Sequence, residues 1–515
     1  MKKYLLGIDL GTTNSKGILF DEEGNVVKNH SETYKTYFIN NIWAEQNADD
    51  WWNGIKNILL TICSDLPSNI IENIAGLCIS SQTPTILPID GNGIPLRNAI
   101  IWMDKRAEKE FDELLNEIDR NEYKAIVGGE PDVSFLPFKL MWLKKYEPEI
   151  FKKAHKFLQA SSYVNYKLTG VYSADIDQAI LSQCYDVNSK KWSKRLGDII
   201  GVDFEKIFPE PVPSNTIIGY VTEEAARQTG LVPGIPVMAG TTDGIASMCA
   251  IGISKSGQAA EIAGTSSLIF AGHTEQSSYD RPVISKVSSI NGLPYVFDAP
   301  ISCTGASIKW FLDTIGKNYC EQADFTSRDV FDIINEAAAK VEAGSNGVLY
   351  FPYLLGERAP LWNTHAKGMF IGMSMNTTQE DLLRAVFEGT TFAVKHVLEE
   401  MKAAGAEVNS FKIAGGGAKS KTWLEIKASV LDMDIQILDS NLDVPFGDVL
   451  IVGNAVGIYP DMNETMEKMI KIKEVIHPNK EWVKKYEKIY PFYVSMYKAL
   501  DSNLKEYEFV TNSIN

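Results

Sequence analysis

Cysteine is scarce in this chain, and its copies are not paired in the sequence. The six cysteines are scattered without a C-x-x-C pair. This pattern excludes both a disulfide framework and a zinc site built on thiolates. Because unpaired thiols persist in a reducing compartment, we expect a cytoplasmic protein.

Long hydrophobic runs are also missing. No stretch approaches the roughly 20 apolar residues that a membrane-spanning helix needs. Asp9 interrupts the first apolar stretch, which is too early for the hydrophobic region of a signal peptide. We therefore expect no membrane partner.

Positive charge is in deficit. The chain has 50 Lys and Arg against 66 Asp and Glu, a net charge of -16, and no basic cluster is interleaved with aromatic residues. Such a surface repels the phosphates of nucleic acids, so we predict no nucleic-acid partner. The six histidines are isolated, which excludes a paired histidine metal site.

Apolar residues are plentiful and short segments alternate in type. With 515 residues and 45% hydrophobic content, the chain is long enough for two globular domains. Residues 49–60 and 104–118 have helical patterns, and residues 74–79 read as a strand. This alternation is typical of an α/β protein.

The most informative segment is residues 5–20, where two apolar runs flank Asp9 and a Gly-Thr-Thr turn. Consecutive backbone N–H groups in such a turn converge on an anion. A carboxylate beside a phosphate repels it unless a cation lies between, so Asp9 predicts a Mg²⁺ site. The alternative is an edge hairpin with an ordinary polar turn.

The same plan returns in the middle of the chain. Residues 234–239 read as a strand that leads into Gly-Thr-Thr-Asp243 and a buried helix, 245–251. Residues 261–270 then repeat the strand, Gly-Thr turn, strand plan. We interpret the chain as a diverged internal duplication with its boundary at 245–255, giving domains 1–248 and 249–515.

Further signals lie in the second half. Thr377-x-x-Glu380 predicts a capping box before a helix at 381–388. Residues 411–414 read as a strand, Gly415-Gly416-Gly417 as a turn, and Ser420 as the N-cap of a helix ending near residue 431.

The glycine-bearing turns predict a nucleotide held between two halves of the chain. They lie at 11–16, at 240–244 with 264–266, and at 415–417. G-x-x-x-x-G-K-[ST] and a strand-to-helix G-x-G-x-x-G are both absent, which excludes the P-loop and Rossmann sites. The turn at 415–417 also fits a tight strand-to-helix connection without a ligand.

Two acids complete the predicted phosphoryl-transfer site. A group that neutralises a cation cannot also deprotonate a hydroxyl, so we assign the metal to Asp9 and the general base to Asp243. We expect the two acids to face each other from the two lobes. The alternative for Asp243 is a simple helix N-cap.

With these residues the chain resembles the FGGY carbohydrate kinases over roughly residues 4–460. The most specific match runs from Gly368-x-Phe370-x-Gly372-Met373 through seven residues to Asp381-Leu382-x-x-Ala385-Val386-Phe387-Glu388. The loop 356–360 and the segment Trp43-Ala44-Glu45-Gln46 are similar to xylulose and gluconate kinases. Residues 137–142 match the first family signature only approximately.

The resemblance implies a fold and an activity. The fold is α/β, with two ribonuclease-H-like domains of the actin-like ATPase type and a cleft between them. The activity is ATP-dependent phosphorylation of a sugar hydroxyl with Mg²⁺, and the partners are a small sugar and ATP. Whether the chain forms a homodimer is left open.

The resemblance also implies roles for individual residues. Asp243 is the catalytic base, and Asp9 and Asp243 lie at the metal. The residues that bind the nucleotide are Thr12, Thr13, Asn14, Lys16, Gly264, Thr265, Gly305, Gly417 and Ala418. The residues at the sugar are Gln82, Thr83, Pro84, Trp102, Asp104 and Asp243. The alternative for Trp102 is a place in the core, and for Asp104 a cap on the following helix.

At the segment that should read the sugar, residues 82–84, this chain departs from the pattern of the related kinases. Xylulose and gluconate kinases tend to have Gln-Met-His after Ser81, and glycerol kinases Gln-Arg-Glu, whereas this chain has Gln82-Thr83-Pro84. Xylulose or a related ketopentose is the first prediction, and gluconate, another sugar acid or a polyol the second. An actin-like nucleotide switch without sugar transfer is a rival of another class.

Overall fold

The computed structural model describes residues 2–40, 42–275, 284–287, 293, 295–438 and 443–514. The chain divides into two compact units. Unit 1 comprises Met1–Ser254, Lys286–Pro294 and Asn441–Ile470. Unit 2 comprises Lys255–Ser285, Tyr295–Ser440 and Lys471–Asn515. Residues 441–470, which we expected in the C-terminal domain, therefore belong to unit 1.

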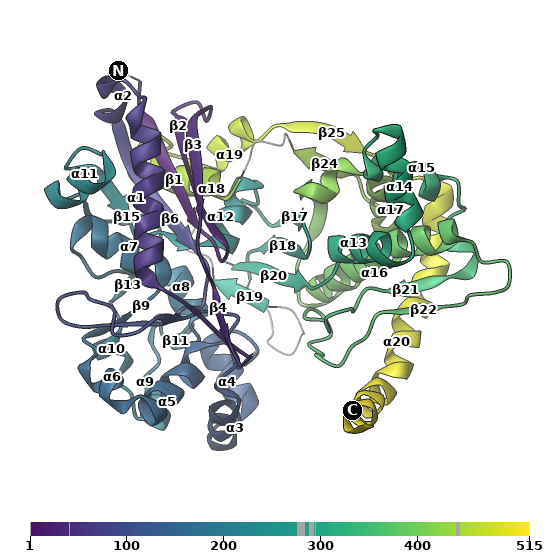
Figure 1. Ribbon diagram of the computed structural model, residues 1–515, viewed down its shortest axis with the longest axis horizontal. Helices are drawn as coiled ribbons and strands as arrows, with labels where there is room; N and C mark the ends of the chain where they lie inside the picture. The colour runs from purple at the N-terminus through teal and green to yellow at the C-terminus, as the bar shows by residue number, and fades with distance from the viewer. Residues whose placement is uncertain are drawn as a thin grey trace. The chain divides into compact units, whose positions relative to one another are not determined.

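Unit 1 is built on a seven-stranded mixed sheet (Figure 1). The strand order is β14-β15-β6-β1-β2-β3, and β16 also pairs with β6. The strands are β1 (Tyr4–Leu10), β2 (Asn14–Asp21), β3 (Val26–Thr33), β6 (Ile74–Ser81), β14 (Ile217–Tyr220), β15 (Pro236–Met238) and β16 (Thr241–Thr242). Strand β6 runs parallel to β1, and β15 and β16 both run parallel to β6. Strands β1, β2 and β3 form an antiparallel meander.

Helices cover both faces of this sheet (Figure 1). Helices α1 (Ala48–Ser64), α7 (Ala160–Thr169) and α11 (Glu223–Thr229) lie on one face, and α12 (Asp243–Ala250) and α18 (Val444–Ala455) lie on the other. Strand β1 is buried from both sides, with Leu6, Ile8 and Leu10 in the core beneath α1. Alternation along the strand turns the odd-numbered residues of β1 to the face covered by α18.

Smaller elements complete unit 1. The remaining helices are α2 (Ser68–Ile71), α3 (Glu108–Glu117), α4 (Arg120–Val127), α5 (Leu136–Tyr146), α6 (Pro148–Lys153), α8 (Ile176–Leu181), α9 (Lys194–Ile200), α10 (Phe204–Ile207) and α19 (Met462–Met469). The short strands are β4 (Tyr37–Ile39), β5 (Trp43–Gln46), β7 (Leu87–Ile89), β8 (Ala99–Ile100), β9 (Lys156–Leu158), β10 (Ala174–Asp175), β11 (Tyr185–Asp186), β12 (Lys191–Trp192) and β13 (Pro211–Val212).

Unit 2 repeats the plan with a second seven-stranded mixed sheet, in the order β19-β20-β18-β17-β23-β24-β25. The strands are β17 (Gly257–Ala263), β18 (Ser267–His273), β19 (Ile284–Val287), β20 (Tyr295–Ile301), β23 (Val408–Ala414), β24 (Ile435–Leu438) and β25 (Ile472–Ile476). As in unit 1, an antiparallel meander is followed by two parallel strands and an antiparallel edge strand. The expected internal repeat is therefore present in the topology.

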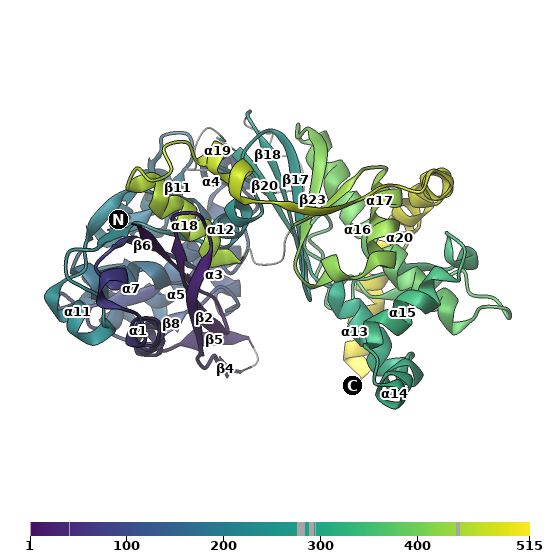
Figure 2. The same cartoon turned by 90° about the horizontal axis from the view of Figure 1, so that it is seen from above.

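The helices of unit 2 include two long ones, α16 and α20, of 25 and 35 residues. Figure 2 shows α16 and α17 beside the same sheet, and their apolar residues share a core with β17 and β23. The helices are α13 (Gly305–Thr314), α14 (Lys317–Thr326), α15 (Val330–Ala339), α16 (Gln379–Ala403), α17 (Lys421–Leu431) and α20 (Lys480–Ile514), with 3-10 turns η1 (Ser345–Gly347) and η2 (Gly416–Lys419) and a hairpin of β21 (Leu349–Phe351) and β22 (Met369–Ile371). None of the described helices combines the length and the apolar character that a membrane crossing requires.

Two local predictions need correction. The capping box before α16 is formed by Thr378 and Asp381, not by Thr377 and Glu380, because the Thr378 hydroxyl accepts from the Asp381 N–H and the Asp381 carboxylate accepts from the Thr378 N–H. The helix then continues to Ala403, far beyond the predicted 381–388. Ser420 caps α17 as predicted.

Candidate active site

The predicted phosphate loop is a tight turn between β1 and β2. Asp9 pairs with Lys16 across the hairpin, and the Gly11 N–H donates to the Asn14 carbonyl at 3.1 Å. Thr13 and Asn14 are exposed, and Thr12 is half-buried. The turn therefore presents backbone and hydroxyl groups of the predicted phosphate-binding residues to solvent.

Parallel strands bring the two predicted acids together. Asp9 of β1 lies beside Ser80 of β6, and Ser80 lies beside Thr241 of β16. Since these strands run in the same direction, their carboxyl ends meet at one edge of the sheet. Asp243 follows β16 directly, and its charge acts on Asp9.

Asp243 is the first residue of α12 but not its cap. The Thr242 hydroxyl caps the helix by accepting from the Ile245 N–H at 3.1 Å, which overturns the N-cap alternative for Asp243. One oxygen of Asp243, Oδ1, accepts from the Gly244 N–H at 2.7 Å.

The expectation that the two acids come from different lobes is wrong. Both Asp9 and Asp243 belong to unit 1. The repeat of the Gly-Thr turn suggested a mirrored pair. However, residues 241–242 form β16, which pairs with β6 in the same sheet as β1. The true counterpart of the β1–β2 turn is the turn at 264–266 between β17 and β18.

A third acid joins the pair and was missed by sequence reasoning. Asp443 caps α18 through a hydrogen bond from the Val444 N–H to Oδ1 at 2.8 Å. Its Oδ2 accepts a hydrogen bond from the Lys16 Nζ. An Asp before Val-Pro predicts a helix cap, but no local signal shows that this cap lies beside Lys16, 427 residues away in the chain.

Burial and like charge act on Asp9. Burial raises its pKa well above the ordinary value, the negative charges of Asp243 and Asp443 raise it further, and Lys16 opposes them. Its Oδ1 is buried without a hydrogen-bond partner among the described residues. A carboxylate in this state is suited to a cation or to a proton.

The residues around Asp9 fit a Mg²⁺ ion that is held by few protein ligands. Among the described residues, no three His, Cys, Asp or Glu side chains are arranged to hold a metal ion. Mg²⁺ commonly binds through one or two carboxylates, with waters and substrate phosphates as the other ligands. The unpartnered Asp9 oxygen beside the phosphate loop meets that requirement.

Two of the predicted sugar residues, Trp102 and Gln82, are connected to the predicted phosphate loop by hydrogen bonds that meet at Thr12, whereas Pro84 is buried next to Thr83. Trp102 donates from Nε1 to the Thr12 hydroxyl at 2.9 Å. Gln46 donates to the Thr12 carbonyl at 2.7 Å and accepts from the Gln82 Nε2 at 2.6 Å. The Gln82 Oε1 is buried and has no partner in the described part of the chain. Thr83 follows, half-buried.

Trp102 and Asp104 differ in their exposure. Trp102 is 36% exposed, so it is not a core residue. Asp104 is fully buried, accepts from the Ala44 N–H at 2.6 Å and pairs with Arg106 at 2.7 Å. The cap of α3 is Ala107, so Asp104 does not cap this helix. Its oxygens hold the segment around Trp102, and contact with a sugar stays a prediction.

In unit 2, the other predicted nucleotide residues gather at one end of the sheet. The Gly305 N–H donates to the Gly264 carbonyl at 3.2 Å, and the Ala306 N–H donates to the Thr265 carbonyl at 2.8 Å. Gly415 has a φ of +90° and packs so closely that a Cβ there would lie 2.6 Å from the Ala263 carbonyl oxygen. The turns at 264–266, 305 and 415–418 thus meet beside the end of β17.

The family is decided by comparison with known proteins. The model of the FGGY family of carbohydrate kinases, N-terminal domain, matches residues 4–251, and that of the C-terminal domain matches residues 259–455. The chain belongs to the FGGY family of carbohydrate kinases. Its predicted α/β fold with two domains is thereby confirmed, and so is its nature as a carbohydrate kinase.

Relatives of this FGGY kinase carry different names. A xylulose kinase of Staphylococcus epidermidis is 30% identical over 99% of this chain and 100% of its own. A gluconokinase of Bacillus licheniformis is 27% identical over 99% of this chain and 98% of its own. The crystal structure of xylulose kinase from Rhodospirillum rubrum aligns with a TM-score of 0.90 at 25% identity, covering 98% of this chain and 100% of that one.

Proposed function

We propose that this FGGY kinase transfers the γ-phosphate of ATP to a hydroxyl of a sugar, with Asp243 as the general base and Asp9 at a Mg²⁺ ion. The observation that carries this assignment is the meeting of both acids at the carboxyl ends of parallel strands, beside the phosphate loop. Phosphoryl transfer needs positioning, charge stabilisation and one proton acceptor.

Each residue has a defined task in this proposal. Asp243 accepts the proton of the attacking hydroxyl at its carboxylate, and the Gly244 N–H bond to Oδ1 holds that carboxylate in place. Lys16 supplies positive charge to the phosphates, with Asp443 as its partner when no phosphate is present. Mg²⁺, when bound beside Asp9, would neutralise charge on the transferred group.

For the nucleotide, we propose that Thr12, Thr13 and Asn14 contact the phosphates. In unit 2 we assign Gly264, Thr265, Gly305, Gly417 and Ala418 to the same ligand. For the sugar, we assign Gln82, Thr83, Pro84, Trp102 and Asp104. The unpartnered Gln82 oxygen supports this, because a buried amide acceptor suits a sugar hydroxyl.

Xylulose or a related ketopentose is the proposed substrate. Xylulose kinases recur among the relatives that span the whole chain. Gluconate is the second candidate, because a gluconokinase matches over nearly the same length and the segment from Glu357 to Asn363 resembles gluconate kinases. Thr83-Pro84 supports neither choice, since it offers no imidazole or charge.

The test is a screen for ADP release with ketopentoses, gluconate, other sugar acids and polyols. One sugar should raise ADP release well above the rate without sugar, and chelation of Mg²⁺ should abolish it. Asp243→Asn should lower kcat roughly 10³-fold, because the proton acceptor is lost, and leave the Kd for ADP within a few fold. Asp329→Asn, at an exposed helix cap in unit 2, is the matched control and should retain full activity.

Two outcomes would overturn the proposal. ATP hydrolysis that no sugar changes would favour the nucleotide switch. Full turnover of the Asp243→Asn variant on the preferred sugar would remove Asp243 as the base.

A further inference from the structure

A buried ion pair lies beneath the glycine turns of unit 2. The Nζ of Lys427, on α17, donates to the two carboxylate oxygens of Glu261, on β17, at 2.9 and 2.6 Å. Both side chains are fully buried. Glu261 lies on the same face of β17 as Ala259 and Ala263, which belong to the apolar core shared with α17. Two charges therefore lie against the apolar core of unit 2.

Such a pair is a poor source of stability. Removing two charges from water costs about as much as their attraction returns, and apolar residues of similar volume are often as stabilising. Burial lowers the pKa of Lys427, which reflects this cost. A buried ion pair instead fixes the position of a helix along a strand, because sliding the helix would leave a charge unpaired in the core.

The Glu261 end of the pair reaches two of the glycine turns. Glu261 Oε1 also accepts from the Ser267 hydroxyl at 2.6 Å. Ser267 directly follows the 264–266 turn, and its hydroxyl bonds to that of Thr304 at 2.7 Å. Thr304 is fully buried and precedes Gly305, the first residue of α13.

The Lys427 end reaches the third turn. The Lys427 Nζ lies 4.4 Å from the centre of the Trp423 ring. This ring packs under Gly417, where an added Cβ would lie 3.0 Å from a ring carbon. Trp423 is itself held by a hydrogen bond from Nε1 to the Thr391 hydroxyl at 3.1 Å. All three turns thus rest on one buried polar network.

We infer that the Glu261–Lys427 pair is a positioning unit that sets the spacing of the turns at 264–266, 305 and 415–418 and thereby the affinity for the nucleotide. The inference rests on the proposed function of these turns as the nucleotide site. Neither charged side chain touches the nucleotide, because both are fully buried. They act through Ser267, Thr304 and Trp423.

The test replaces the pair by uncharged residues of similar size. Glu261→Gln combined with Lys427→Met should fold with a thermal midpoint within a few degrees of the parent, because neither residue leaves a charge in the core. The Kd for ADP, measured by calorimetry without sugar, and the KM for ATP should rise about 10-fold. The KM for the preferred sugar should stay within two-fold, since unit 1 is unchanged.

The matched control is another buried ion pair in the described part of unit 2. Arg384 and Glu388 lie one turn apart on α16, and their side chains are 0% and 2% exposed. The Arg384 Nε lies 2.8 Å from the Glu388 Oε1. Their other partners include Tyr486 and Ser345 rather than the glycine turns. Glu388→Gln combined with Arg384→Met removes equal charge. It should leave the Kd for ADP unchanged.

A narrower variant covers the case in which the double variant does not fold. Thr304→Val removes one hydroxyl from the network and keeps the ion pair, and it should raise the Kd for ADP about three-fold. An unchanged Kd for ADP in every folded variant of this network, or an equal rise in the Arg384 control, overturns the positioning role. A parent protein that binds no ADP or ATP overturns the proposed function instead.

Discussion

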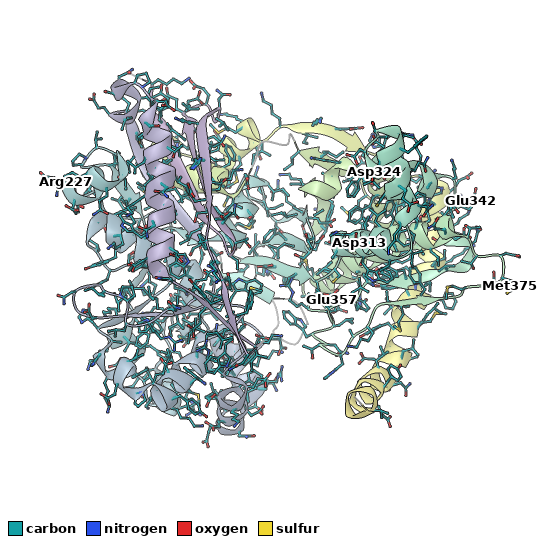
Figure 3. The ribbon with its side chains drawn as sticks, viewed as in Figure 1. Arg227, Asp313, Asp324, Glu342, Glu357 and Met375 are labelled. Carbon is teal, nitrogen blue, oxygen red and sulfur yellow. The ribbon has the colours of Figure 1, made fainter. Side chains whose placement is uncertain are left out.

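Glu357 is a buried carboxyl group outside the predicted site. It lies in the loop after β21, where Figure 3 labels it, and only 4% of its surface is exposed. Its Oε1 accepts from the N–H groups of Ser302 and Arg358, both at 2.8 Å, while Oε2 has no partner among the described residues. Burial is the largest cause that raises its pKa, to about 7.

This raised pKa predicts how stability depends on pH. Between the ordinary value of 4.5 and about 7, the folded protein keeps a proton on Glu357 that the unfolded chain releases. Stability contributed by this group is therefore fully present below pH 4.5 and is lost as pH rises through 7, by roughly 3 kcal/mol in total. Glu357→Gln should remove this part of the slope in urea unfolding between pH 5 and pH 8.

The control is Glu342, an exposed acid labelled in Figure 3 whose pKa is lowered by Lys485. Glu342→Gln should leave the slope between pH 5 and pH 8 in place. An unaltered slope in the Glu357 variant would show that another group is responsible for it.

Helix α18 packs closely against β1 and α12. Its residues from Pro445 to Gly453 are all buried. A Cβ on Gly7 of β1 would overlap the carbonyl oxygen of Pro445, and a Cβ on Gly447 would overlap that of Ala246 on α12. These contacts bring the start of α18, with Asp443, to the end of β1 that carries Asp9.

Two glycine-to-alanine changes inside helices should therefore have opposite effects. Gly447→Ala forces α18 away from α12 and should destabilise the protein by about 1–3 kcal/mol, as overpacking typically does. Gly54→Ala in α1 meets no atom closer than 3.7 Å and should stabilise it by up to about 1 kcal/mol through helix propensity. Urea unfolding of both variants measures the difference, and a neutral Gly447→Ala would contradict the close packing.

The two units have similar sheets, but neither unit is formed by one continuous segment of the chain. In both sheets an antiparallel meander is followed by two parallel strands and an antiparallel edge strand, although the edge strand precedes its neighbour in the chain in unit 1 and follows it in unit 2. Unit 1 is completed only by residues 441–470, which carry α18 over β1 and β6. Without α18, the apolar face of these central strands would be open to water.

A fragment of residues 1–254 alone should therefore aggregate. The same fragment joined through a flexible linker to residues 441–470 should be monomeric and give dispersed amide signals in NMR spectra, because the linked segment restores α18. A scrambled 441–470 segment of equal composition is the control and should not rescue folding. A monomeric, well-folded 1–254 fragment would contradict the dependence on α18.

Local patterns in the chain were enough to predict the α/β class, the hairpin at residues 4–21, the repeat and the cap at Ser420. Each of these rests on residues within about one strand or turn of one another, where alternation, glycine and capping side chains act directly. The signature from Gly368 to Glu388 likewise led to the family. Asp9 and Asp243 could be singled out because each follows or ends an apolar strand beside a Gly-Thr turn.

The pairing of distant segments was not readable in this way. Asp243 follows a strand of the sheet that carries Asp9, Asp443 contacts Lys16, and Glu261 contacts Lys427. All three neighbourhoods depend on which strand or helix lies beside which. Burial of apolar faces and the order of the parallel strands decide which elements are adjacent. Both involve residues that are hundreds of positions apart in the chain. Local composition carries no record of that choice, so only the folded chain reveals it.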